Sequence, residues 1–276
     1  MSVRGFVILV ALAAWAQTVP LPRSVKQGGT LRLHAPAGAV SATMNGRTVP
    51  LFPQSDGGPF GLMPVPANEK PGDYKLDLLD GRGSVIESAT VAVADAHFKK
   101  QNVVIEPALT TLKPAPGESE DASEFRKLVT GTRYWSEPLS PPLRSCMTSP
   151  YGVQRYLNGK PTGDIHTGLD QRGAAGTPIH AVADGVVKLV RPWALHGNTV
   201  GIDHGQGLES MYLHMSRFAV AEGATVKKGD VIGYVGTTGR SNAPHLHWTL
   251  YVNGVPVNPL DWVHLSPCAP RVPVKQ

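Results

Sequence analysis

The chain has 276 residues, and its 30 glycines and 25 prolines make up about a fifth of them, against an average of about 12%. This content of turn-forming residues excludes a helical bundle. A charged fraction of 17% beside 41% hydrophobic residues excludes a disordered chain. The net charge of +5 suits an anionic polymer such as nucleic acid or cell wall, but it is also an ordinary solubility charge. Because no run of Lys or Arg forms a basic stripe, we expect no nucleic-acid partner.

The first 16 residues have the pattern of a secretory signal peptide. Arg4 precedes an apolar stretch from Gly5 to Ala14, and Ala14-Trp15-Ala16 supplies a small-x-small cleavage site. The alternative is an uncleaved anchor, but the apolar run is shorter than the roughly 20 residues of a membrane span. We therefore expect a periplasmic or secreted protein without a membrane span after cleavage.

The chain has two cysteines, Cys146 and Cys268. In an oxidising compartment such a pair is a candidate disulfide, which would join the tail to the start of the second domain. Their wide separation argues against a zinc-thiolate site.

Residues 25–96 alternate between apolar and polar positions and contain turn signals such as Asn45-Gly46 and Asp80-Gly81. This pattern predicts a small β-sandwich and resembles that of bacterial immunoglobulin-like modules. Because the segment lacks a cluster of catalytic residue types, we expect a binding or spacer role.

Residues 97–143 are rich in proline and predict a linker with one amphipathic helix over 118–129, whose apolar side carries Phe125, Leu128 and Val129. Strand patterns return after this linker. These patterns cover residues 179–190, 199–202, 208–215 and 231–235. The expected fold is all-β, with an open antiparallel sheet in the second domain.

Three short motifs in this second domain contain histidine. In an extended chain His166 and Asp170 share a face, as do His245 and His247 with Leu246 pointing to the opposite layer. In the third motif, alternation sends Tyr212 and His214 to one side. Each motif alone is more often a solvated or half-exposed pair, but all three occur in one domain.

Two imidazoles and a carboxylate provide three ligands for Zn²⁺ and leave a fourth position for water, the arrangement of catalytic zinc sites. Bound Zn²⁺ lowers the pKa of that water toward about 7, and further histidines beside it can transfer protons. The motifs therefore point to a hydrolase.

The order and surroundings of these motifs resemble the LytM or lysostaphin-like metallopeptidases, the M23 family of zinc endopeptidases that cut peptidoglycan. The resemblance runs from about Thr148 to Pro259. It includes the motifs His166-Thr167-Gly168-Leu169-Asp170, Tyr212-Leu213-His214 and Pro244-His245-Leu246-His247.

The resemblance implies one zinc ion per chain, bound by His166, Asp170 and His247. It also implies that His214 and His245 are the catalytic histidines beside the metal. In several relatives a tyrosine six residues before the first zinc histidine stabilises the oxyanion. Here that position is Lys160, and Tyr156 is the nearest substitute, so neither residue is assigned this role.

The domains implied are a signal peptide over 1–16, an Ig-like domain over 25–96, a linker over 97–143, an M23 catalytic domain of LytM type over 144–262 and a tail over 263–276. The expected function is a zinc metalloendopeptidase that hydrolyses peptidoglycan crosslinks. The alternative is an inactive LytM-type wall-binding activator of other hydrolases. A second alternative follows from residues 226–235, which also resemble a half-motif of biotinyl and lipoyl carrier domains, but those proteins are cytoplasmic.

The other histidines have simpler expected roles. We interpret His204 as a turn residue, and His180 and His196 as candidates for the cleft mouth. Surface positions are expected for His34, His97 and His264.

Overall fold

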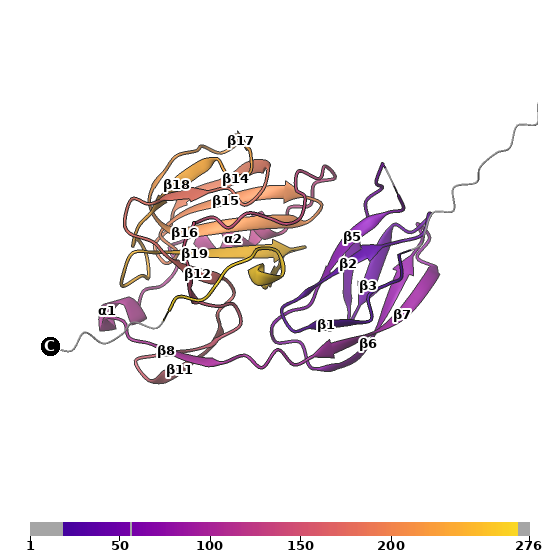
Figure 1. Cartoon of the computed structure of the whole chain (residues 1–276), viewed down its shortest axis with the longest axis horizontal. Coiled ribbons are helices and arrows are strands. Elements are labelled where there is room, and N and C mark those ends of the chain that lie inside the picture. The colour runs from indigo at the N-terminus through magenta and orange to yellow at the C-terminus, as the bar shows by residue number, and fades with distance from the viewer. Residues whose placement is uncertain (1–18, 56, 270–276) are drawn as a thin grey trace, which may run out of the picture.

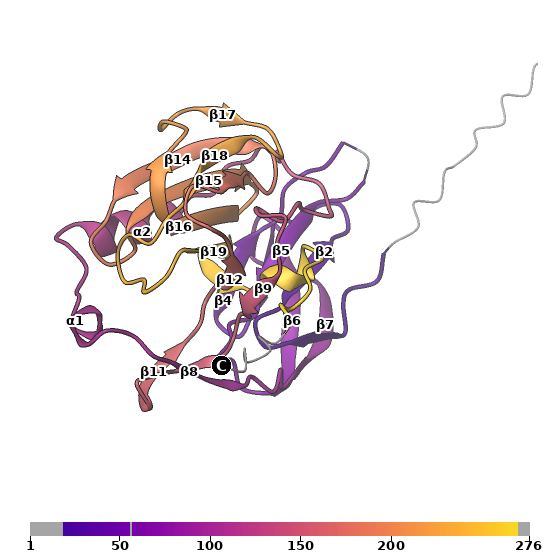
Figure 2. The same cartoon turned by 60° about the vertical axis from the view of Figure 1, so that its left-hand side comes forward.

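The computed structural model describes residues 19–55 and 57–269 (Figure 1). The predicted signal peptide, 1–16, and the end of the predicted tail, 270–276, lie outside the described residues. Within them, no helix has the length and apolar character needed to cross a membrane. The expected all-β class is confirmed, and two bodies of strands lie side by side in Figure 1 and overlap in the turned view of Figure 2.

The first body consists of two sheets with a shared apolar core. Its strands are β1 (Ser24–Lys26), β2 (Thr30–His34), β3 (Ser41–Met44), β4 (Arg47–Pro50), β5 (Phe60–Pro64), β6 (Gly72–Leu79) and β7 (Val85–Ala94). One sheet has the order β1-β7-β6-β3-β4, and the other pairs β2 with β5. Asn45-Gly46 forms the predicted hairpin turn between β3 and β4, because both residues adopt the positive φ that such a turn requires.

A large antiparallel sheet forms the second body. Its strands and 3₁₀ helix are β9 (Met147–Ser149), β12 (Leu169–Arg172), β13 (Pro178–His180), β14 (Gly185–Pro192), β15 (Asn198–Gly205), β16 (Leu208–Phe218), β17 (Thr225–Val226), β18 (Val231–Val235), β19 (His245–Val252), β20 (Val255–Val257) and η1 (Pro259–Asp261). The main path is β17-β14-β15-β16-β19-β12-β9. The predicted strand over 179–190 is instead divided between β13 and β14.

The linker contains α1 (Pro107–Thr110), α2 (Glu118–Arg126) and one strand that the sequence did not predict, β8 (Lys100–Val103). This strand joins β10 (Gln154–Leu157) and β11 (Lys160–Ile165) in a three-stranded sheet, with the order β11-β10-β8. Figure 1 shows β8 and β11 below the main sheet. The linker therefore contributes to the second body as well as connecting the two.

Helix α2 covers one face of the main sheet. Phe125 packs there with Leu189, Met211 and Tyr251, and Leu128 contacts the same cluster. The helix ends at Arg126, earlier than predicted, and the Val129 side chain is 47% exposed, so Val129 is not part of the packed face. The opposite face of the sheet carries the main core, to which Tyr212, Leu246 and Trp248 contribute.

The two bodies are in contact through β5. Its Phe60 and Leu62 belong to the core of the second body, and Leu62 O accepts a hydrogen bond of 2.7 Å from Asn253 Nδ2. Arg32 and Glu137 form an ion pair across the same boundary. These contacts bring the first body close to one rim of the cleft described below.

Candidate metal centre and cleft

The strands β12 and β19 place two of the predicted ligands directly opposite each other. Asp170 and His247 are partners in this antiparallel pair, where facing Cβ atoms lie about 5 Å apart. His245 and His247 line the same cleft while Leu246 is buried in the core, as the alternation predicts. His166 lies three residues before β12 and completes the group.

The three side chains present one ligand atom each to a common point. Asp170 Oδ1 lies 3.1 Å from His166 Nε2 and 2.8 Å from His247 Nδ1, and these two nitrogens are 3.0 Å apart. In the described part of the chain these residues are the group of His, Cys, Asp and Glu side chains able to hold a metal ion. All three side chains are at most 15% exposed.

The remaining ring nitrogens determine which atoms carry the lone pairs. His166 Nδ1 lies 2.8 Å from the Pro150 carbonyl oxygen, so it must carry the proton and Nε2 the lone pair. His247 Nε2 lies 3.1 Å from Thr249 Oγ1, a hydroxyl that can accept its proton. In these tautomers three electron-rich atoms meet without a proton among them. A cation at their centre fits this donor set, and His₂Asp is a ligand set that Zn²⁺ accepts.

The surroundings keep these groups in the forms that bind a metal. Burial alone would raise the pKa of Asp170, but the adjacent His166 and His247 hold it well below its usual value. Burial also lowers the pKa of His247 to about 4, so its imidazole is neutral. Gly168 leaves room for this ring, because a Cβ there would lie 2.5 Å from His247 Nε2.

His214 and His245 lie beside the candidate ligands. The ring centroid of His214 is 5.1 Å from that of His245 and 6.3 Å from that of His247. Nδ1 of His214 donates to Thr238 O at 2.8 Å, and Nδ1 of His245 lies 2.8 Å from Ala243 O. Each ring therefore keeps a lone pair on Nε2. Burial, with the nearby His245 and His247, lowers the pKa of His214 to about 3.

The direction of the His214 side chain differs from the prediction. Tyr212 packs in the core, whereas His214 lines the cleft, so these two residues do not lie on one side as simple alternation suggested. His214 has φ of 60°, in the left-handed region, and the β15–β16 register shifts between Asn198 and Val200, next to it. This irregularity turns the imidazole from the core face to the cleft.

A cleft of ≈ 890 Å³ lies over these residues. Leu195 and His196 line one part of it, and Pro66–Asn68 of the first body line another. His196 Nδ1 pairs at 2.6 Å with Glu118, a buried side chain that also accepts backbone N–H groups from residues 194–196. His180 is not among the residues lining the cleft, and its Nδ1 pairs with Gly229 O.

Sequence reasoning missed Arg155, which lines the cleft from β10, whereas Tyr156 and Lys160 do not. Arg155 Nη2 donates to Asp170 Oδ2 at 2.8 Å, in an ion pair whose side chains are 19% and 10% exposed. Residues 155 and 156 point to opposite sides of a strand. The position of Arg155 in a strand was the available signal, but its partner across 15 residues was not visible in the sequence.

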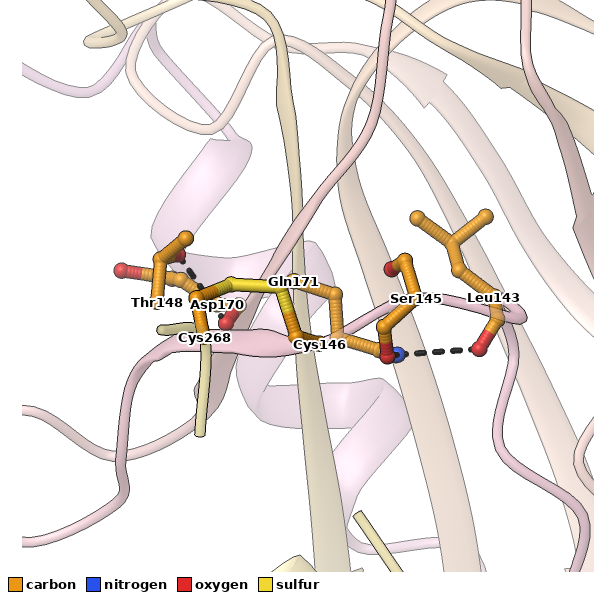
Figure 3. Close-up of a disulfide and its surroundings, with 7 residues drawn as sticks. All are labelled: Leu143, Ser145, Cys146, Thr148, Asp170, Gln171 and Cys268. Carbon is orange, nitrogen blue, oxygen red and sulfur yellow. Dashed lines mark hydrogen bonds between the residues drawn. A yellow bond between two sulfur atoms is a disulfide. The ribbon is translucent and has the colours of Figure 1, made fainter. Parts of the chain in front are cut away.

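The disulfide between Cys146 and Cys268 is present in the structure and joins residues 122 positions apart (Figure 3). The tail pairs with β9 on either side of it, because Met147 N donates to Ser266 O and Cys268 N to Met147 O. Next to the bridge, Gln171 donates to Leu143 O and Thr148 to Asp170 O (Figure 3). The disulfide therefore joins the C-terminal segment to the start of β9, which pairs with β12, the strand that carries Asp170.

Comparisons with known proteins agree with this geometry. Residues 164–259 match the model of Peptidase family M23. The chain is 43% identical over 125 residues to the DD-carboxypeptidase/endopeptidase Mpg of Neisseria meningitidis serogroup B, and 41% identical over 111 residues to the peptidoglycan DD-endopeptidase ShyA of Vibrio cholerae. These matches cover 45% and 40% of this chain but only 28% and 25% of those proteins.

A solved structure extends the likeness to most of the chain. The crystal structure of a putative peptidase M23 from Pseudomonas aeruginosa has a TM-score of 0.68 and 26% identity, covering 90% of this chain and 97% of that one. Residues 164–259 form a domain of peptidase family M23, a family of metallopeptidases. The expected LytM-type sheet is thereby confirmed.

Proposed function

We propose that this protein is a zinc-dependent endopeptidase that hydrolyses peptide crosslinks of peptidoglycan. The observation that carries the proposal is the convergence of His166 Nε2, Asp170 Oδ1 and His247 Nδ1, with ligand atoms within 4.8 Å of one another on the wall of a cleft. These three residues would hold one zinc ion per chain. When bound, zinc supplies Lewis acidity and lowers the pKa of water to about 7.

His214 and His245 are proposed to handle protons at the substrate. The carbonyl oxygens of Thr238 and Ala243 hold their Nδ1 atoms in the protonated tautomer, so each Nε2 is free to accept a proton. Fixed tautomers keep this basic atom available without reorganisation. The same nitrogens, once protonated, can donate to the leaving amine or stabilise the developing oxyanion.

The proposed substrate class follows from the relatives and from the charge of this chain. ShyA is named a peptidoglycan DD-endopeptidase and Mpg a DD-carboxypeptidase/endopeptidase. Arg155, Arg172 and Arg240 line the cleft together with two acidic side chains, Asp164 and Asp170. Stem peptides of the wall carry free carboxylates, which a cleft with this balance of charge attracts.

We also propose a periplasmic or secreted location. The N-terminal pattern predicts export, and a disulfide between the two cysteines of the chain suits an oxidising compartment. For the first body we propose a contact with the wall or with a regulatory protein. Its residues Pro66–Asn68 line the cleft, which supports this proposal.

The test is digestion of purified peptidoglycan by the zinc-loaded protein, with mass spectrometry of the released fragments. We expect fragments cut at a peptide crosslink, and their masses identify the bond. Zinc content per chain is measured on the same sample. A chain that binds the wall but releases no fragments would instead be a wall-binding activator, and the proposal would be wrong.

A further inference from the structure

The two carboxylate oxygens of Asp170 have different partners. Oδ1 faces His166 and His247, whereas Oδ2 accepts a hydrogen bond of 2.8 Å from Arg155 Nη2. The Arg155 side chain is 19% exposed, so this ion pair is largely shielded from water. A carboxylate held at Oδ2 in this way presents one chosen oxygen to the metal position.

The guanidinium is in turn held by residues outside the segment that matches the family model. Its Nη2 lies 3.3 Å from Ser149 Oγ, and this hydroxyl donates to Gln101 Oε1 at 2.7 Å. Ser149 Oγ also lies 3.4 Å from His166 Nδ1. Gln101, Ser149 and Arg155 therefore form a polar layer behind two of the candidate ligands.

The linker strand β8 places this layer. In the parallel pair of β8 and β10, Arg155 is the register partner of Gln101. The strand that carries Gln101 comes from the linker, some 50 residues away in the chain, so the layer forms only when the linker is docked.

We propose that Arg155 is the positioning residue of the metal centre, and that it fixes Asp170 as a ligand through a single oxygen. This inference rests on the proposed function. Arg155 acts through Asp170 and needs no contact with the substrate or the metal.

Two effects of the guanidinium on metal binding oppose each other. Its positive charge repels a dication, so its removal would by itself tighten zinc binding. Its hydrogen bond orients the ligand, and loss of such a partner typically weakens metal binding by about 10- to 100-fold. We expect the second effect to win, because the guanidinium contacts Oδ2, whereas the two ligand nitrogens face Oδ1, so the charge is set back from the metal position while the hydrogen bond acts directly on the ligand.

The experiment compares Arg155→Met, Arg155→Gln and Arg155→Lys in the full chain. Arg155→Gln keeps a donor for Oδ2 without the charge. Arg155→Lys keeps the charge but replaces the planar guanidinium with a single ammonium nitrogen. The matched control is Arg172→Met, because Arg172 is exposed on the same cleft and its guanidinium has no hydrogen bond or ion pair within the described residues. Zinc affinity is measured by competition with a chelator, and the melting temperature of each metal-free variant confirms that it folds.

The visible absorption of the Co²⁺-substituted protein adds a second measurement. If Oδ2 is released, Asp170 can bind through both oxygens, and a higher coordination number weakens the Co²⁺ bands. We expect Arg155→Met to bind zinc roughly 10- to 100-fold more weakly and to show weaker bands. In zinc affinity and in the Co²⁺ bands, Arg155→Gln should lie nearer to the wild type than Arg155→Met does. Arg172→Met should match the wild type in both measurements.

Zinc binding by Arg155→Met that is as tight as in the wild type, or tighter, would overturn the inference. An Arg155→Gln variant as weak as Arg155→Met would also overturn it, since the hydrogen bond would then not be the cause. Failure of the proposed function is a separate result: it would appear as a wild-type chain that binds no zinc or cuts no peptidoglycan.

Discussion

The candidate metal centre and the β15–β16 hairpin both bury histidine and carboxylate side chains in one sheet, but their hydrogen bonding differs. At the hairpin, His204 is fully buried, with Nδ1 2.7 Å from Asp184 O and Nε2 2.7 Å from Ser210 Oγ. Ser210 Oγ is hydrogen-bonded to the Tyr212 hydroxyl, which accepts from Val182 N. His204 lies in β15, so its interpretation as a turn residue is wrong.

The buried carboxylates of the two regions differ in the direction of their pKa shift. Burial and the neighbouring Asp203 raise the pKa of Glu209 well above its usual value, which favours the neutral acid. Asp170, beside two imidazoles, is held ionised. The same residue types therefore make a closed structural cluster around His204 in one place and a candidate metal centre in the other. What distinguishes the two sets of imidazoles is that each ring nitrogen of His204 has a hydrogen-bond partner outside the ring, whereas the lone pairs of His166 and His247 face each other and Asp170 Oδ1.

The largest expected effect breaks the metal centre itself. Asp170→Ala removes the one anionic ligand, so zinc content should fall from about one ion per chain to less than roughly a tenth of that. Metal analysis after dialysis measures it. The control is Asp164→Ala, which removes an exposed carboxylate of the same cleft and should keep the zinc. Full zinc occupancy in Asp170→Ala would contradict the ligand assignment.

The next effect separates ligands from proton carriers. His214→Ala and His245→Ala should keep zinc but lose peptidoglycan hydrolysis by about 10²- to 10⁴-fold, the usual contribution of a general acid or base. His247→Ala should lose both zinc and activity. The control is His180→Ala, whose ring pairs with Gly229 O away from the cleft. A fully active, zinc-loaded His214→Ala enzyme would exclude His214 from the mechanism.

Much of this architecture could be predicted from local patterns. The Asn45-Gly46 turn, the strand 231–235 and the shared face of His245 and His247 depend on near neighbours in the chain, and all three are present in the structure. The pairing of Cys146 with Cys268 followed from there being only two cysteines.

The rest depends on contacts between distant segments. β8 has no alternating pattern of its own and is a strand because it pairs with β10. Arg155 gains its role from its ion pair with Asp170. His214 points to the cleft because its backbone has a positive φ, and a simple alternating pattern does not predict this. Tertiary pairing decided these positions, and one sequence carries no direct signal for it.

A smaller effect concerns the bridge behind the metal centre. In the chain-entropy model, a loop as long as that between Cys146 and Cys268 stabilises the fold by about 4 to 5 kcal/mol, an upper figure. The double variant Cys146→Ser, Cys268→Ser should therefore lose up to about 4 kcal/mol. Urea unfolding of both proteins without metal measures the difference, and reduction of the wild type should reproduce it. Equal stability of oxidised wild type and double variant would show that the bridge constrains nothing.

The smallest effect concerns the closed cluster and its dependence on pH. Burial lowers the pKa of His204 to about 4, from an ordinary value near 6.5. Below pH 6.5 the unfolded chain binds a proton at this residue that the folded chain does not. The stability associated with neutral His204 is therefore complete above pH 6.5 and is lost as the pH falls toward 4.

Between pH 7.5 and 5 this linkage should remove about 2 kcal/mol of unfolding free energy, because each full pH unit below the ordinary pKa near 6.5 corresponds to about 1.4 kcal/mol. His214 and His247 also titrate in acid, so wild type must be compared with His204→Gln, which keeps them and removes only the one titration. Urea unfolding of both proteins in EDTA, at pH 7.5 and at pH 5, gives the difference. His204→Gln should be less stable than wild type at pH 7.5, because one of the two hydrogen bonds of the ring is lost, but should lose less stability on acidification. If both proteins lose the same amount, His204 is not held neutral in the folded chain, and the contrast between the closed cluster and the metal centre fails at this residue.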